Sequence, residues 1–264
     1  MENVKKRLLQ MTKAKHLQIM LGTGTLANDS IALQLKLLKR RGFILTNGEF
    51  GNRLIKQVIR VSLSFDTYEI EIGRPFLYNE IEKLVKHQEY EWLWFVHHET
   101  STGMLNNLEE LIGISKKYGI KLCVDCISSI GAIQPSLEDV YFASGVSGKA
   151  IGAYTGLSFV FYNHIVNANE TLPTYMDIGM YEENGSVPYS QSWNLIYALQ
   201  EALKKFEDET EYKKIYQTYA FIEEAVTNMG LQLVSSEEHA SSIILTVAVD
   251  KKLSSKEIGD SLAL

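Results

Sequence analysis

Short apolar runs alternate with longer periodic segments along the first two thirds of the chain. In the longer segments, apolar residues recur every three or four positions, which predicts amphipathic helices over residues 4–15, 26–40, 52–62, 78–87 and 108–118. The short runs predict buried strands over residues 17–21, 43–46, 68–72, 92–97, 120–125, 141–143 and 157–162. This order is typical of an α/β fold in which helices flank a mostly parallel central sheet.

The pattern changes after residue 163. Residues 163–190 are rich in loop-forming residues, and the segments that follow predict helices over 193–206 and 212–229, strands over 231–234 and 243–249, and a helix over 256–262. We therefore predict a large sheet domain over residues 1–190. Residues 191–264 are expected to begin a smaller, incomplete α+β domain.

Composition and charge narrow the class of protein. The chain has 264 residues, 45% of them hydrophobic, and a net charge of −6, which argues against nucleic-acid binding. No apolar run approaches the ~20 residues that span a bilayer, and the charged first 16 residues lack the apolar core of a signal peptide. With only two cysteines, a disulfide framework is excluded. We predict a cytoplasmic protein without nucleic-acid or membrane partners.

The arginines are confined to the first 74 residues. They are Arg7, Arg40, Arg41, Arg53, Arg60 and Arg74. A planar guanidinium that grips an acidic ligand must therefore come from the first third of the chain or from another chain.

Two loops at the carboxyl ends of predicted strands, where ligands bind in open α/β sheets, offer contacts to a flat anionic ligand. The loop after the first strand contains Thr23, Gly24 and Thr25, directly before a helix; it is either a phosphate or carboxylate seat or a threonine cap on a tight turn. In the loop after the second strand, Phe50 is either a platform for a flat ligand or a cap over the sheet edge.

The next two loops carry polar groups. Adjacent histidines at 97 and 98 point to opposite faces of a strand, so we predict no metal site there and expect the hydroxyls of residues 100–102 to bind a polar ligand. Asp125 ends a buried strand and either serves a cation or caps the following turn. Cys123 and Cys126 are interpreted as packing residues.

Lys149 lies in a glycine-flanked loop between two apolar strands. We expect it to be enclosed, because burial lowers the pKa of a lysine and frees its amine for Schiff-base chemistry. An anion seat, an aromatic platform, hydroxyl donors, an acid and a buried amine at one sheet edge together suit pyridoxal 5'-phosphate.

Five motifs carry a family resemblance: GTGTLAND, NGEFGNR, HHETSTGMLN, VDCISSIG and SGKAIGAYTGLSFVF. Over about residues 17–200 the chain resembles the class V aminotransferases of fold type I, in the alanine–glyoxylate, serine–pyruvate and 2-aminoethylphosphonate–pyruvate branch. The resemblance implies a homodimeric, pyridoxal-phosphate-dependent enzyme that moves an amino group between a small amino acid and a 2-oxo acid.

The resemblance also implies roles for individual residues. Lys149 corresponds to the lysine that forms the Schiff base, and Asp125 to the partner of the ring nitrogen. The remaining cofactor contacts are the phosphate loop, the two faces of the ring, a hydroxyl near the ring oxygen, and a hydroxyl reaching the phosphate of the neighbouring subunit: Thr23, Gly24 and Thr25; Phe50 and Ile127; Ser101; and Ser190.

The chain also departs from the family pattern. Gly148 stands where the family has a polar residue, and the family's N-terminal arm and C-terminal substrate-binding arginine have no counterpart, so the chain looks truncated at both ends. An alternative is therefore a catalytically silent homologue that binds the cofactor or only a partner. A desulfurase or lyase of the same superfamily is disfavoured because Gly148 replaces the histidine that precedes its lysine and the cysteines are confined to residues 123–126. A nicotinamide dehydrogenase is disfavoured because residues 39–41 are basic where an acid is needed.

Overall fold

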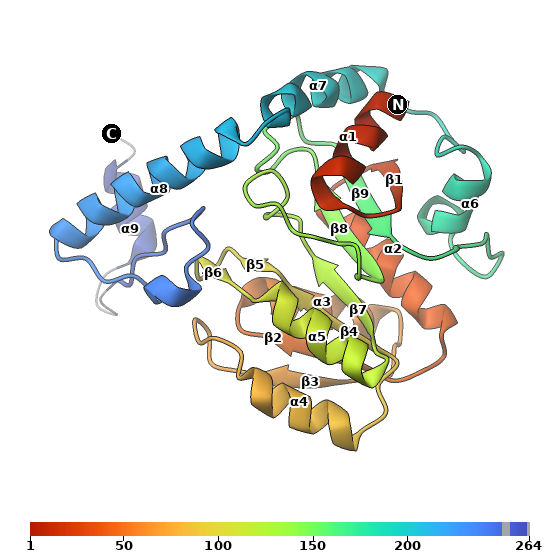
Figure 1. Cartoon of the computed structure of the whole chain (residues 1–264), viewed down its shortest axis with the longest axis horizontal. Coiled ribbons are helices and arrows are strands. Elements are labelled where there is room, and N and C mark those ends of the chain that lie inside the picture. The colour runs from red at the N-terminus through yellow and green to blue at the C-terminus, as the bar shows by residue number, and fades with distance from the viewer. Residues whose placement is uncertain (250–253, 263–264) are drawn as a thin grey trace.

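The computed structural model describes residues 1–249 and 254–262 (Figure 1). Its central sheet contains β1 (His16–Leu21), β2 (Gly42–Thr46), β3 (Phe65–Glu69), β4 (Trp92–Val96), β7 (Lys121–Asp125), β8 (Phe142–Val146) and β9 (Leu157–Tyr162). The helices are α1 (Glu2–Thr12), α2 (Gly24–Leu37), α3 (Glu49–Arg60), α4 (Tyr78–His87), α5 (Leu108–Tyr118), α6 (Ile178–Glu183), α7 (Trp193–Leu203), α8 (Thr210–Asn228) and α9 (Ser255–Leu262).

The sheet has the strand order β1-β9-β8-β7-β4-β2-β3. Strands β3, β2, β4, β7 and β8 pair in parallel, whereas β9 is antiparallel to both β8 and β1. In register, Val96 of β4 pairs with Asp125 of β7, which pairs with Ser144 of β8. The predicted mostly parallel sheet is confirmed. Because β1 and β8 are both antiparallel to β9, β1 runs in the direction of the five parallel strands, and the carboxyl ends of these six strands lie along one edge.

Side chains alternate between two hydrophobic layers. On β4, Leu93 and Phe95 pack in one cluster with residues of α1, α4, α5 and α7, while Trp92 and Trp94 pack in another with residues of α2, α3 and α6. Because successive side chains of a strand point to opposite faces, a strand covered by helices on both faces must be apolar throughout. This explains why every residue from 92 to 96 is apolar.

Most predicted helices and strands form close to their expected positions. Helices α4 and α5 begin and end at the predicted residues. The strand predicted over 68–72 is wrong by three residues, because β3 pairs with β2 from Gly42↔Phe65 to Thr46↔Glu69. This strand lies at the edge of the sheet and is only partly buried, so its apolar pattern indicated its ends poorly.

Two features were not predicted. One is α6, whose first turn is capped by Asp177: its side chain accepts a hydrogen bond from the N–H of Gly179. The other is a hairpin of β5 (His98–Glu99) and β6 (Met104–Leu105), which is too short to give a periodic pattern.

The final quarter is partly as expected. Helix α7 continues into a short 3-10 turn, Lys204–Phe206, and α8 runs away from the sheet with Tyr219 as its buried residue (Figure 1). The strands predicted over 231–234 and 243–249 are wrong: the described residues there form a single bridge between Leu233 and Val247. Two short segments without a third strand gain too little pairing to form a regular ladder.

The division at residue 190 stays a prediction. In the described residues, no helix combines the length and the apolar character that crossing a membrane requires.

Phe95 provides a test of the core. Its side chain is fully buried in the cluster shared by α1, α5 and α7. Phe95→Ala is expected to lower the free energy of unfolding by about 3–5 kcal/mol, because it leaves a cavity. The measurement is urea denaturation followed by circular dichroism. Tyr197→Ala, at a side chain that is 65% exposed, should leave the midpoint nearly unchanged; equal midpoints for the two variants would contradict this packing.

Candidate active site

A cavity of about 440 Å³ opens at the edge where the parallel strands end. Its walls come from the last residues of β4 and β7 and from residues that follow β1, β2, β7 and β8. The lining residues are Thr23, Gly24, Thr25, Asn28, Asp29, Phe50, Arg53, Lys56, Gln57, Arg60, Val96, Asp125, Ile127, Ser128 and Lys149. Seven of the nine predicted site residues are among them, and Ser101 and Ser190 are not. The topology thus brings together side chains that are up to 126 positions apart, Thr23 to Lys149.

Asp125 is the buried acid of the cavity. Its Oδ2 accepts a hydrogen bond from Nδ2 of Asn28 at 2.8 Å, and its Oδ1 accepts one from the N–H of Ile127 at 2.9 Å. Burial raises the pKa of the Asp125 carboxyl above its usual value; the two hydrogen bonds act in the opposite direction, and the charge of Glu99 adds to the rise. A cation placed beside this carboxylate would relieve the cost of its burial.

The loop before α2 is open to an anion. Thr23 has an extended backbone, and its side chain makes no capping hydrogen bond to the first turn of the helix. The threonine-cap interpretation therefore does not apply, and the first N–H groups of a 14-residue helix lie beside the cavity. A Cβ on Gly24 would overlap with Cδ1 and Cγ1 of Ile127, so a larger residue here would require the Ile127 side chain to move.

Phe50 lies in the first turn of α3 and packs partly against the second hydrophobic layer. The guanidinium carbon of Arg53 is 4.7 Å from the centroid of its ring. Since Phe50 also lines the cavity, its ring combines contact with the core and access to a ligand.

The expected enclosure of Lys149 is wrong. Lys149 is exposed and lies on the rim of the cavity, in a turn closed by the hydrogen bond from the N–H of Gly152 to its carbonyl. The flanking Gly148 packs tightly against Thr155, but no element covers the lysine side chain within the described residues. The burial that was expected to free the amine of Lys149 is therefore not provided by this chain alone.

The two predicted serines lie outside the cavity. The hydroxyl of Ser101 donates a 2.5 Å hydrogen bond to Oε1 of Glu99 and accepts one from the N–H of Glu49 at 3.1 Å. Ser190 is exposed. Its expected reach to a neighbouring subunit stays a prediction.

The histidines and cysteines are held in the interior. Burial lowers the pKa of His97 to about 3 and that of His98 to about 4. Nδ1 of His97 lies 3.0 Å from the hydroxyl of Ser129, whereas Nδ1 of His98 faces the carbonyl of Ser128 at 3.3 Å. Cys123 and Cys126 are free and buried, and burial raises the pKa of both thiols, as suits packing residues.

Three further residues that shape the site were not predicted from the sequence. Asn28 holds Asp125, Glu99 holds the start of α3, and Arg53 contacts Phe50. The confinement of arginine to the first third of the chain was the available signal for Arg53, and the structure places Arg53, Lys56 and Arg60 along the cavity. Nothing in the local pattern indicated the other two, since their partners are 97 and 48 positions away.

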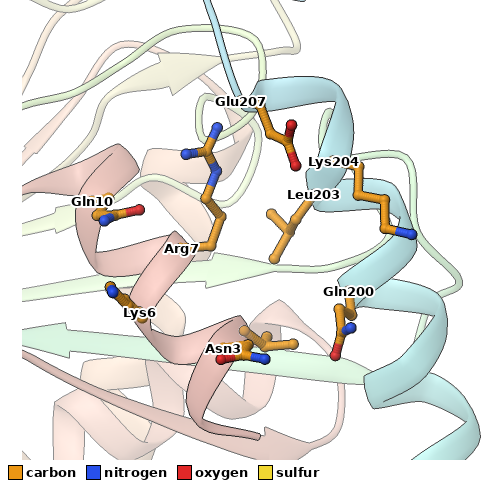
Figure 2. A pocket seen from close by; sticks show the side chains of 9 residues that line it. Asn3, Lys6, Arg7, Gln10, Gln200, Leu203, Lys204 and Glu207 are labelled. Carbon is orange, nitrogen blue, oxygen red and sulfur yellow. The ribbon is translucent and has the colours of Figure 1, made fainter.

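A second cavity, of about 370 Å³, lies between α1 and α7 (Figure 2). Side chains of α1, including Lys6 and Arg7, line one side, and those of α7 and its continuation, including Lys204 and Glu207, line the other. None of the predicted site residues contributes to it. The candidate active site is therefore the cavity at the sheet edge.

The fold is shared with aminotransferases of known structure. Ureidoglycine–glyoxylate aminotransferase from Bacillus subtilis matches with a TM-score of 0.88 at 18% identity, covering 99% of this chain and 72% of that one. Alanine–glyoxylate aminotransferase from Nostoc sp. matches with a TM-score of 0.87 at 24% identity, covering 99% and 74%. At these identities the likeness concerns the fold, which is the fold type I architecture that the motifs implied.

Sequence comparison identifies the family. The profile of the family Aminotransferase class-V matches residues 1–240, so the chain belongs to the class V aminotransferases, and the predicted resemblance is confirmed. It is 24% identical to 2-aminoethylphosphonate–pyruvate transaminase from Bacillus mycoides over 86% of this chain and 66% of the relative. The enzyme of that name from Pseudomonas aeruginosa (strain UCBPP-PA14) is 29% identical over 71% and 53%. The chain thus spans just under two thirds of the first relative's length.

The burial of the Asp125 carboxyl predicts how its ionisation changes the free energy of unfolding. A raised pKa means that the folded chain holds the proton more tightly than the unfolded chain, so Asp125 costs stability as the pH rises above about 4. In the cofactor-free protein, Asp125→Asn should therefore raise the free energy of unfolding at pH 7 by about 1 kcal/mol. The unpartnered Oδ1 of Asn28 can accept from the new amide after a side-chain flip.

Urea denaturation of both proteins between pH 7 and pH 4.5 measures this difference. The advantage of the variant should shrink as the pH falls. A variant that is less stable than the parent at pH 7 would show that the ionised carboxylate is well accommodated.

Proposed function

We propose that this protein is a pyridoxal-phosphate-dependent aminotransferase that moves an amino group between a small amino acid and a 2-oxo acid. The observation that carries the proposal is the meeting of Lys149, Asp125, Phe50 and the Thr23–Thr25 loop around one cavity. Membership of the class V family supports the same reaction.

The residues of the cavity suit this cofactor. The phosphate would occupy the loop at the start of α2, and the ring would lie between Phe50 and Ile127. Asp125 would face the ring nitrogen, where a cationic N–H offsets the burial that now raises its pKa. Ser101 would approach the ring oxygen, and this contact needs a rearrangement, since its hydroxyl bonds Glu99 and lies outside the cavity.

When bound, pyridoxal phosphate supplies an aldehyde that condenses with amines and a ring that accepts electrons. Lys149 is the amine of this chain that would bond the aldehyde as a Schiff base. Once an amino acid has displaced it, its Nζ would carry the proton away from the substrate Cα. The side chain lies on the rim of the cavity, where it can swing between these two tasks.

The amino donor is proposed to carry an acidic group. Arg53, Lys56 and Arg60 line the cavity along one helix, and none of them belongs to a salt bridge within the described residues. Relatives named as 2-aminoethylphosphonate–pyruvate transaminases support a phosphonate or carboxylate there. The homodimer in which Ser190 reaches the other subunit's phosphate, and the cytoplasmic location, are part of the proposal and rest on the resemblance and the composition.

Lys149→Ala tests the proposed nucleophile. The parent protein mixed with pyridoxal phosphate should show a visible absorption band and retain the cofactor after borohydride reduction, and the variant should lose both. Lys83→Ala, at an exposed lysine of α4, is the matched control and should keep both. A variant at 149 that still traps the cofactor would show that another lysine reacts.

A single half-reaction separates the aminotransferase from its alternative, a silent homologue that binds cofactor or only a partner. Addition of alanine, serine or 2-aminoethylphosphonate to the loaded protein should convert its spectrum to that of the aminated cofactor. A protein that stays yellow with all three donors would favour the silent homologue.

Arg53→Gln tests whether the positive charge of Arg53 binds the acidic group of the donor. Loss of one charge that faces an acidic group should raise KM for a phosphonate or carboxylate donor about tenfold, which is about 1.4 kcal/mol, and change KM for a neutral amine much less. Arg74→Gln, at an exposed arginine paired with Glu71 outside the cavity, is the control. An equal rise in KM for charged and neutral donors would disprove the assignment.

A further inference from the structure

The β5–β6 hairpin places a carboxylate against the first turn of α3. Glu99 is fully buried, and it belongs to no salt bridge within the described residues. A buried charge is stable only where hydrogen bonds or opposite charge replace water. The partners of Glu99 therefore show what it does.

The carboxylate is surrounded by hydrogen-bond donors. Its Oε2 accepts from the N–H groups of Phe50 and Gly51, both at 3.1 Å. Its Oε1 accepts from the hydroxyl of Ser101 at 2.5 Å and, at 3.3 Å, from the N–H groups of Ser101 and Phe50. The ionised form only accepts hydrogen bonds and so satisfies all of these donors.

Together, two side chains of the hairpin region cap α3 from outside the helix. The N–H of Glu49 donates to Ser101, and the next two N–H groups donate to Glu99. These groups have no partner inside a helix, and the helix dipole favours a negative charge at this end. The local cap residue is Gly48, which has no side chain to perform this task.

Gly48 is itself part of the arrangement. A Cβ at Gly48 would overlap with the Cγ and Cδ atoms of Glu99. Only a glycine lets the carboxylate approach the helix this closely, so the two residues form one unit.

We infer that Glu99 is a positioning residue: through the first turn of α3 it sets the place of Phe50 on the cavity wall and holds Ser101 beside it. The importance of that placement for the cofactor rests on the proposed function. The rest of α3 is anchored independently by Leu54 and Val58 in the core. Loss of Glu99 should therefore loosen the first turn and spare the helix.

Glu99→Gln keeps the shape and places an amide N–H₂ against backbone donors. In the cofactor-free protein, hydrogen exchange at the amides of Phe50 and Gly51 should accelerate at least tenfold, while the amides around Val58 stay protected. Glu49→Gln, at an exposed glutamate of the same turn, is the matched control and should change neither. Unchanged protection in Glu99→Gln would overturn the inference.

Titration with pyridoxal phosphate tests the link to the site. Glu99→Gln and Phe50→Leu should each raise the dissociation constant at least tenfold, and the double variant should be little worse than the weaker-binding single variant, because Glu99 acts through Phe50. If the increases in the dissociation constant of the two single variants multiply in the double variant, Glu99 does not act through Phe50. If the parent protein binds no cofactor, the proposed function fails, and the exchange experiment still decides the positioning role.

A second variant covers the case in which Glu99→Gln does not fold. Glu99→Asp keeps the charge but withdraws it by one methylene, so the Phe50 and Gly51 amides should lose part of their protection. Ser101→Ala removes the hydroxyl that accepts the hydrogen bond of the Glu49 N–H and should expose that amide. Full protection of all three amides in these two variants would contradict the inference.

Discussion

Six strands that run in the same direction end along one edge of the sheet, and this constraint places the candidate site. The inner strands β2, β4, β7 and β8 are buried on both faces. The loops that leave the strands must turn there before their helices return across the sheet. Asp125 lies in this edge because it is the last residue of β7, and Lys149 lies near it because it follows β8. The apolar layers that fix the strands thus also fix the distances between groups that are far apart in the chain.

The charged side chains at this edge of the sheet differ in their burial. Two carboxylates, Asp125 and Glu99, are buried, and each is held by hydrogen-bond donors from another element. The cations, Arg53, Lys56, Arg60 and Lys149, lie along the cavity. A buried acid beneath a basic rim suits a ligand with an anionic exterior and a cationic ring atom. Burial of Asp125 costs the cofactor-free chain stability, because it raises the pKa of this carboxyl.

The hydrophobic pattern of the sequence predicted the interior strands well and the peripheral strands poorly. The run at residues 92–96 could be identified as a strand because burial on both faces requires an apolar residue at every position. The edge strand β3 was misplaced by three residues because one of its sides lacks a partner strand. The segments near Leu233 and Val247 have strand-like composition, yet a single bridge joins them, because regular pairing depends on further partners that composition cannot reveal.

The candidate site divides in the same way. Residue type and position after a strand were enough to predict that Asp125, Phe50, Thr23 and Lys149 lie near one another, because the carboxyl ends of parallel strands lie at one edge of a sheet. Their roles toward a cofactor stay a prediction. Contacts between distant loops were not accessible, because no periodicity links Glu99 to the N–H groups of Phe50 and Gly51 or Asn28 to Asp125. Nor could the pattern tell whether a glycine-flanked lysine is covered: exposure depends on what else packs over the loop, and the folded chain leaves Lys149 open.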